Sequence, residues 1–275
     1  MLCVDALQVY RQLEAGTAKP TLPERQQIPT HLLDLAEPDQ TVNAALWAQH
    51  ADLAIAEVHA RGQWPLLVGG TGLYLRALQR GLAEIPPIPE ALRANLADEY
   101  RDRGEDALWQ ELHAVDPAYA QKTPPQNRQR LLRALEVFRH TGRTFSDFHR
   151  EHQQKPSRHQ LFLVLLDPPR QLLHARIDAR AAEMAAPLLA EVAELRAQGL
   201  TRDLPAFQAL GYREAWHALE NHESTEEFAH NLALAHRNYA KKQATWFRGE
   251  TADLRLPTAD PAAVAAALRA WFAAE

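Results

Sequence analysis

The sequence predicts an α/β protein, built on a parallel sheet flanked by helices and carrying a small helical insertion. Three observations support this fold class. Short apolar runs at 2–4, 66–68 and 159–166 alternate with amphipathic helical stretches, an order typical of parallel strands joined by right-handed crossovers. The run at 66–68 leads into a glycine-rich turn, and residues 85–157 contain no strand pattern.

The proline-rich segment Ile85–Pro89 breaks the α/β alternation and marks the start of the insertion. Lys155-Pro156-Ser157 has the composition of a linker that returns to the sheet. We therefore expect the α/β core at 1–84 and 158–275, with a helical domain at 85–157 inserted between its two parts.

Composition narrows the class of protein. The 275 residues are 46% hydrophobic, enough for a full core, and the net charge of −5 means that any contact with nucleic acid needs a local basic surface. The single cysteine excludes an intrachain disulfide framework and a cysteine-based metal cluster. There is neither a membrane-length apolar run nor a secretory signal pattern, so we expect a cytoplasmic protein.

The first apolar run ends at Asp5, and open α/β sheets place their active sites at such strand ends. Capping of a turn is the alternative role for Asp5. A second apolar segment, 29–34, ends in Asp34. His31 has no second metal-ligating residue at suitable spacing, so packing or capping is its expected role.

A helical pattern over 42–61 precedes the central strand 66–68, whose apolar run predicts a parallel strand covered on both faces. Three glycines around Thr71, within 69–72, then allow close backbone approach at a helix N-terminus. These features favour an anion site, with a tight turn capped by Thr71 as the alternative.

Basic residues gather at two further places. An arginine run in the insertion indicates either a solvated helix face or an RNA phosphate contact: Arg128, Arg130, Arg133, Arg139, Arg143 and Arg150. The last long helix, 226–248, carries cations beside aromatic residues, a pattern that suits nucleotide stacking with phosphate contact or ordinary core packing: Arg237, Lys241, Arg248, Tyr239, Trp246 and Phe247.

Residues 159–166 predict a buried strand, followed by helices from 171 to 199 and a compact turn at 208–213. An alanine-rich amphipathic helix over 262–271 completes the pattern.

Taken in order, several motifs resemble the bacterial tRNA dimethylallyltransferase family, also called tRNA isopentenyltransferase or IPP transferase. Each motif is short, and their order and spacing carry the resemblance over essentially the whole chain: Asp5 with Gln8-Val9-Tyr10, Gly16-Thr17-Ala18-Lys19-Pro20, Leu67 to Tyr74, Gln129 to Val137, Gly211-Tyr212-Arg213-Glu214, and Tyr239 to Arg248.

The resemblance implies a P-loop NTPase-like fold and transfer of a dimethylallyl group from dimethylallyl diphosphate to N6 of the adenosine 3′ of the tRNA anticodon. It implies Mg²⁺ as cofactor, nucleotide (ATP) binding, a monomer and no membrane partner. By the same resemblance Asp5 removes the amine proton, whereas Thr71 and Arg180 hold the reacting groups and the diphosphate.

Four segments would contact tRNA by family likeness. They are Asp5, Ala6, Leu7 and Gln8; Gln129, Arg130, Leu131, Leu132 and Arg133; Gln208, Ala209, Leu210, Gly211, Tyr212 and Arg213; and Lys241, Lys242, Gln243, Ala244, Thr245, Trp246, Phe247 and Arg248.

The chain departs from the family pattern in two ways. The family opens with a strand, a Gly-x-x-x-x-Gly-Lys-Ser/Thr phosphate loop and a helix before the segment that matches Asp5, and this sequence contains no such loop. Ala6 also stands where many relatives have serine. We expect a truncated product or a misplaced start codon; a chain complete as written would have exposed sheet edges, low stability and little transfer activity.

Two alternatives to the enzyme remain. One is a catalytically inactive tRNA-binding remnant that keeps the basic segments, and the other is a relative of small-molecule P-loop kinases. The second leaves the insertion and the basic aromatic helix without a purpose.

Overall fold

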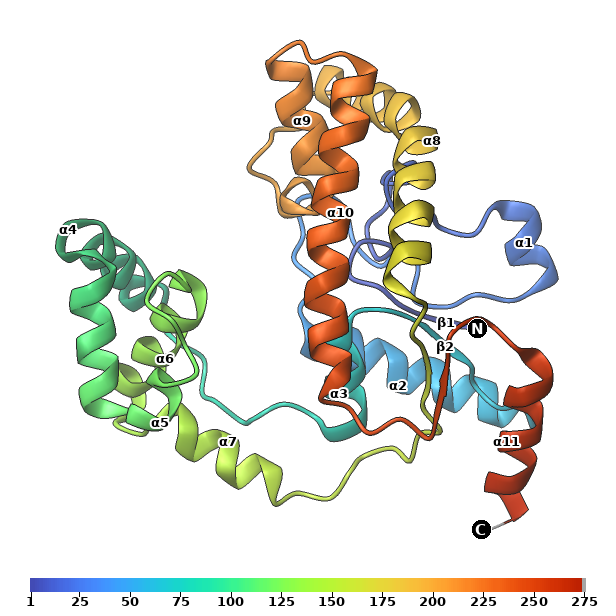
Figure 1. The fold of residues 1–275 in the computed structure, drawn as a ribbon. Coiled ribbons are helices and arrows are strands. Elements are labelled where there is room, and N and C mark those ends of the chain that lie inside the picture. Colours follow the sequence, from blue (N-terminus) through green and yellow to red (C-terminus); the bar gives the residue numbers. More distant parts are fainter. Residues whose placement is uncertain (274–275) are drawn as a thin grey trace. The chain divides into compact units, whose positions relative to one another are not determined.

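A computed structural model describes residues 1–273 and divides the chain into two compact units. The sheet unit comprises Met1–Gln79 together with the chain from His159 onward, and the helical unit is Arg80–Arg158. The insertion thus begins earlier than the expected 85 and ends next to the expected 157. Figure 1 shows the helices and strands of each unit.

The sheet unit holds four short strands and most of the long helices. In chain order they are β1 (Leu2–Val4), α1 (Leu22–Gln27), α2 (Ala44–Ala60), β2 (Leu67–Gly69), α3 (Gly72–Arg80), β3 (Val164–Leu166), α8 (Arg170–Ala197), the 3₁₀ turn η1 (Pro205–Gln208), α9 (Tyr212–Glu220), α10 (Thr225–Arg248), β4 (Leu254–Leu256) and α11 (Pro261–Ala273).

The helical unit consists of α4 (Glu90–Val115), α5 (Pro117–Ala120), α6 (Arg128–Thr141) and α7 (Phe145–Gln153), which confirms a helical insertion. Side chains of α4 and α6, among them Leu108 and Leu131, form its core. Gly104 interrupts α4 with a φ of 80°, a value that glycine adopts without strain.

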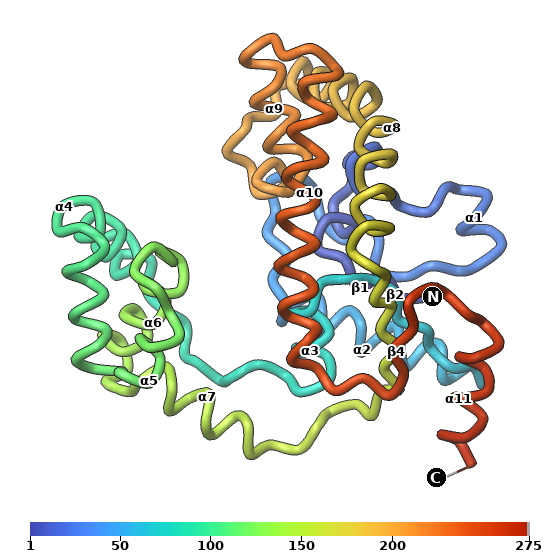
Figure 2. Tube along the Cα trace, viewed as in Figure 1, coloured from blue at the N-terminus to red at the C-terminus, as the bar shows by residue number. Residues whose placement is uncertain are grey.

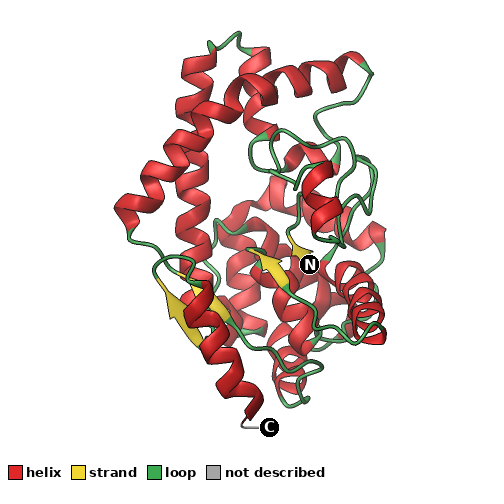
Figure 3. Ribbon diagram, turned by 90° about the vertical axis from the view of Figure 1, so that its right-hand side faces the viewer, coloured by secondary structure: helices red, strands yellow, loops and turns green. Residues whose placement is uncertain are grey.

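The strands pair in parallel as predicted, although they form two separate two-stranded sheets and not the one continuous sheet expected (Figure 3). Leu2 of β1 lies opposite Leu67 of β2, and Val164 of β3 lies opposite Leu254 of β4. Within the described residues β2 and β3 each pair with one strand, so each keeps a free edge.

The prediction that the second and third apolar runs are buried strands was wrong. Val68 of β2 is 46% exposed and Leu166 of β3 is 52% exposed. An apolar run favours a covered strand, but the cover must come from neighbouring elements, and the described part of the chain covers β2 and β3 only in part. Only β1 is buried throughout.

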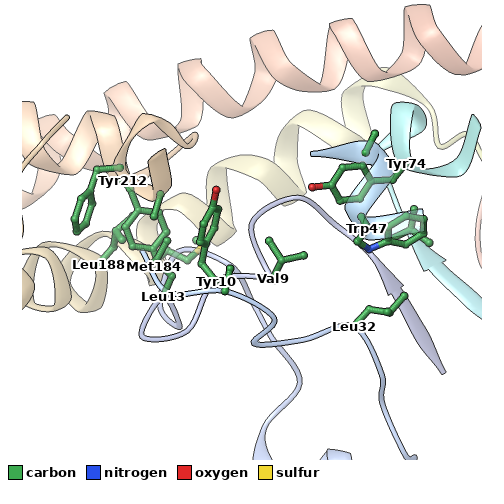
Figure 4. Packing of buried hydrophobic residues seen from close by; sticks show 14 of the residues in the cluster. Val9, Tyr10, Leu13, Leu32, Trp47, Tyr74, Met184, Leu188 and Tyr212 are labelled. Atoms are coloured by element: carbon green, nitrogen blue, oxygen red, sulfur yellow. The ribbon is translucent and has the colours of Figure 1, made fainter. Parts of the chain in front are cut away.

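The core of the sheet unit surrounds β1. Trp47 of α2 stacks on Tyr74 of α3 with ring centroids 4.8 Å apart, and Leu2 of the same cluster is fully buried. A second part of this core gathers Leu13 and Tyr212 with side chains of α8 (Figure 4). Loop, sheet and helices therefore share one apolar cluster.

Helices α8 and α10 run alongside each other, in yellow and orange-red (Figure 2). The sequence suggested two helices from 171 to 199, whereas α8 is a single helix that contains Pro187. No helix among residues 1–273 is long and apolar enough to cross a membrane.

Candidate active site

Asp5 follows directly after β1, at the strand end where the sequence placed it. Its Oδ1 accepts hydrogen bonds from the backbone N–H groups of Leu7, at 2.8 Å, and Gln8, at 3.2 Å. Both roles considered for Asp5 are therefore compatible, because one oxygen caps the turn. Oδ2 has no hydrogen-bond partner among the described residues, which leaves it available to accept a proton.

The glycine turn after β2 is tied to the Asp5 segment. Backbone N–H groups of Gly70 and Thr71 both donate to the Val4 carbonyl at 3.1 Å. The Thr71 hydroxyl accepts the N–H of Ala6 at 3.1 Å. Threonine hydroxyl and aspartate carboxylate are thereby held on adjacent turns.

These contacts correct the expected anion site. The N–H groups of Gly70 and Thr71 are already used by Val4, so they are not free for a ligand. Gly72 and Leu73, the first two residues of α3, keep N–H groups that no described residue accepts. The anion-binding capacity of the turn reduces to this helix N-terminus and the Thr71 side chain.

Helix α10 packs against the same turn. Gln243 donates its Nε2 proton to the Gly70 carbonyl at 3.0 Å, and the Trp246 ring lies so close to Gly72 that a Cβ there would be 2.1 Å from Nε1. The Trp246 ring therefore leaves no room for a side chain at Gly72, whereas at Gly70 the nearest atom is the movable end of Gln243. Gln243 and Trp246, predicted as RNA contacts, hold the turn in place.

Tyr239, predicted either to stack on a nucleotide or to pack in the core, also lies near this turn. It precedes Gln243 by one helical turn on α10. Burial raises the pKa of the Tyr239 phenol and the Asp5 carboxylate adds to the rise, while the Thr71 hydroxyl opposes it. The spacing of four residues from Gln243 was the signal that could have found it.

Arg180 lies on α8, where its Nε contacts the sulfur of Met184 at 3.3 Å. Burial lowers the pKa of His236 on α10, and the nearby Arg180 charge lowers it further. Arg180 is therefore next to α10. It makes no hydrogen bond to Asp5 or Thr71 within the described chain, so its predicted role in holding the diphosphate stays a prediction.

A pocket of about 440 Å³ opens beside Asp5, lined also by Cys3, Gln8, Lys19 and Gly69. The Lys19 ammonium is fully buried and donates to the Tyr10 carbonyl at 2.6 Å, to Asp34 at 2.7 Å and to Glu14 at 3.1 Å. Its charge is satisfied within the protein.

Cys3 is not a nucleophile in this pocket. Burial, with a smaller contribution from the Asp5 carboxylate, raises the pKa of its thiol to about 11, so the thiol is protonated at neutral pH.

Three of the predicted RNA contacts are buried. Leu131 and Tyr212 have 0% exposed surface, so their side chains pack inside the protein, and the backbone of Gly211 is buried as well. Family likeness marks a segment, whereas burial decides which of its side chains can reach a ligand. Gln129, Arg130, Lys241, Lys242 and Arg248 are exposed.

Most of the arginine run is paired with acids. Arg139 bridges Glu99, at 2.7 Å, and Glu111, at 2.6 Å, and these partners lie on α4, far from the run in sequence. Arg133, Arg143 and Arg150 pair with Glu136, Glu151 and Asp147. Arg130 is exposed and has no acidic partner among the described residues, so it remains available to a phosphate.

Within residues 1–273 no group of three or more His, Cys, Asp and Glu side chains could hold a metal ion. The site therefore offers no protein cage for Mg²⁺. In proteins Mg²⁺ commonly enters bound to substrate phosphates, with one or two carboxylates at most.

The fold and site define a parallel α/β protein with a helical insertion, in which a strand-end carboxylate lies beside a glycine-threonine turn. The family model for IPP transferase matches residues 8–250. The chain belongs to this IPP transferase family.

Curated relatives support the assignment. The tRNA dimethylallyltransferase of Halorhodospira halophila is 44% identical, covering 94% of this chain and 84% of the relative. The protein of the same name from Anaeromyxobacter dehalogenans is 45% identical, covering 95% and 87%.

Solved structures agree with the sequence comparison. The tRNA isopentenylpyrophosphate transferase of Bacillus halodurans gives a TM-score of 0.68 at 32% identity, over 99% of this chain and 86% of that chain. A eukaryotic dimethylallyltransferase described as acting on tRNA gives 0.72 at 25% identity, over 90% and 62%.

Proposed function

We propose that this chain is a tRNA dimethylallyltransferase. It transfers the dimethylallyl group of dimethylallyl diphosphate to N6 of the adenosine 3′ of the anticodon. The observation that carries the proposal is the unpartnered Oδ2 of Asp5 beside the Thr71 turn, in a chain of this family. An arylamine nucleophile needs a nearby proton acceptor, and an allylic diphosphate needs donors at its leaving oxygens.

The proposed reaction is a single substitution. The bond between C1 of the dimethylallyl group and the bridging oxygen breaks, and its electron pair leaves with the diphosphate. The lone pair of N6 forms the new bond to C1, and the displaced N6 proton passes to Asp5 Oδ2 and then to solvent. Hydrogen bonds from Leu7 and Gln8 hold the carboxylate in position during this transfer.

The leaving diphosphate is assigned to the N-terminus of α3. Gly72 and Leu73 have N–H groups to donate, and the Thr71 hydroxyl supplies a third donor at the same turn. Arg180 adds positive charge from α8 in this proposal. Mg²⁺, when bound to the diphosphate, would neutralise part of its negative charge.

The exposed basic segments would bind tRNA. An adenine stacked in an anticodon loop must be extruded to reach Asp5, which requires positively charged contacts on the flanking backbone. Arg130 in the helical unit and Lys241, Lys242 and Arg248 on α10 are the candidates. ATP binding, a monomeric state and a cytoplasmic setting also remain proposals.

Mass spectrometry of nucleosides tests the function. Unmodified tRNA is incubated with this chain, Mg²⁺ and dimethylallyl diphosphate, and in parallel with a version carrying an added family phosphate loop and its strand at the N-terminus. Prenylated adenosine from this chain supports the proposal. Product from the extended version alone would identify this chain as a tRNA-binding remnant, and tRNA binding without product in either would reject transfer.

A further inference from the structure

Tyr212 has the surroundings of an internal residue, although its segment resembles an RNA-contacting one. Its side chain lies among Leu13, Met184 and Leu188 in the core (Figure 4). A Cβ at Gly16 would be 2.6 Å from the Tyr212 ring, so the loop around Gly16 passes directly against that ring. The side chain therefore acts on the loop.

The Tyr212 hydroxyl and a carboxylate of α8 hold this loop together. The hydroxyl donates to Oε1 of Glu191 at 2.6 Å and accepts the Gly16 N–H at 3.1 Å. The same carboxylate accepts the N–H groups of Glu14, at 3.0 Å, and Ala15, at 2.8 Å. One phenol-carboxylate pair thus binds three successive backbone N–H groups.

Hydrogen bonds continue from this loop to the proposed base. The next two carbonyls of the loop, Thr17 and Ala18, accept the Nε2 protons of Gln8 at 3.1 and 3.3 Å. The backbone N–H of Gln8 in turn donates to Asp5 Oδ1 at 3.2 Å. An unbroken series of contacts therefore joins α8 and α9 to the carboxylate.

We propose that Tyr212 and Glu191 form a positioning pair, which holds the 14–18 loop and, through Gln8, fixes the direction of the Asp5 carboxylate. The inference rests on the proposed transferase function. Small displacements of a base lower the rate strongly, because proton transfer requires hydrogen-bond geometry. Tyr212 thereby acts on the chemical step, whereas an RNA contact would act on binding.

Steady-state kinetics of Tyr212→Phe separate these two roles. The substitution keeps the ring and removes the hydroxyl, leaving Gly16 N–H without an acceptor. We expect kcat to fall about tenfold with little change in KM for tRNA, the size expected from one lost buried hydrogen bond. Tyr100→Phe is the matched control, because that hydroxyl bonds Glu105 in the helical unit. A raised KM with unchanged kcat would overturn the proposal.

Amide hydrogen exchange gives a readout that does not depend on turnover. In Tyr212→Phe the amides of residues 14–16 and of Gln8 should exchange faster, while those of α2 keep their protection. Wild-type protection throughout 14–16 and Gln8 would contradict the positioning pair even if transfer is confirmed. If instead the wild-type chain shows no transfer, faster exchange still supports the pair and the failure falls on the proposed function.

Glu191→Gln supplies a second variant that retains the shape of the side chain. Its neutral amide is a weaker acceptor for Glu14 and Ala15, so the same amides should exchange faster by a smaller factor.

Combining Tyr212→Phe with Gln8→Ala tests whether Tyr212 acts through Gln8. The double variant should transfer no more slowly than Gln8→Ala alone, since both substitutions act through one path. Fully additive losses would show that Tyr212 does not act through Gln8.

Discussion

The two carboxylate oxygens of Asp5 differ in their hydrogen bonds. Oδ1 accepts the N–H groups of the turn and Oδ2 has no hydrogen-bond partner among the described residues, so one carboxylate organises the backbone and keeps an oxygen free for the proposed proton transfer. Asp5→Asn separates these tasks, because the amide oxygen can still cap Leu7 and Gln8 but is not a base. We expect transfer to fall by about 10²–10⁴-fold with unchanged thermal unfolding.

The measurement is single-turnover formation of prenylated adenosine, with circular dichroism melting as the fold control. Transfer by Asp5→Asn at the wild-type rate would remove Asp5 from the role of base.

Close packing against Trp246 leaves no room for a Cβ at Gly72. A Cβ there would lie 2.1 Å from Trp246 Nε1, whereas at Gly249 the nearest atom would be 3.5 Å away. Gly72→Ala should therefore destabilise the protein by about 1–3 kcal/mol through overpacking. Chemical denaturation of Gly72→Ala and of the control Gly249→Ala measures this difference, and equal stability of the two would contradict the packing found here.

Helices α4 and α6 are held together by ion pairs as well as by apolar packing. Hydrogen bonds from Arg139 lower the pKa of Glu99 to about 2. The folded pKa lies below the ordinary value of about 4.3, so the stabilisation is complete above that value and is lost as pH falls towards 2.

Arg139→Met should reduce the acid sensitivity of the helical unit between about pH 5 and pH 2, because the unfolded and folded pKa values of Glu99 then converge. Urea unfolding of the full chain, followed by hydrogen exchange in α4 and α6, measures the stability of the helical unit across this pH range. Arg101→Met removes only an exposed pair with Asp98 and serves as control. Identical pH profiles for wild type and Arg139→Met would exclude the role of this pair.

Because the whole chain has a net charge of −5, its contacts with RNA require local positive surfaces. Arg130→Gln should weaken tRNA binding and reduce the slope of log K against log salt by about one, as expected for one lost phosphate contact. Arg101→Gln is the matched control, since Arg101 is exposed but paired. Filter binding of tRNA over a series of salt concentrations measures this slope. An unchanged slope in Arg130→Gln would show that Arg130 does not contact a phosphate.

Much of the fold follows from local pattern. The parallel pairing, the helical insertion and Asp5 at a strand end were all predicted, because period and turn residues are local properties. Burial of β2 and β3 was predicted wrongly, since cover depends on elements distant in sequence. The hydrogen bond from Gln243 to the Gly70 carbonyl was not predicted for the same reason, because it joins segments far apart in sequence.

Local sequence patterns were sufficient to identify the family, the order of helices and strands, and the carboxylate at the end of β1. Three sets of contacts became visible only in the tertiary structure. The N–H groups of Gly70 and Thr71 donate to the Val4 carbonyl. Arg139 pairs with two glutamates, and the Tyr212 hydroxyl bonds Glu191 and Gly16. Motifs specify which groups are present, but hydrogen bonds between distant segments determine which of these groups remain free for a substrate.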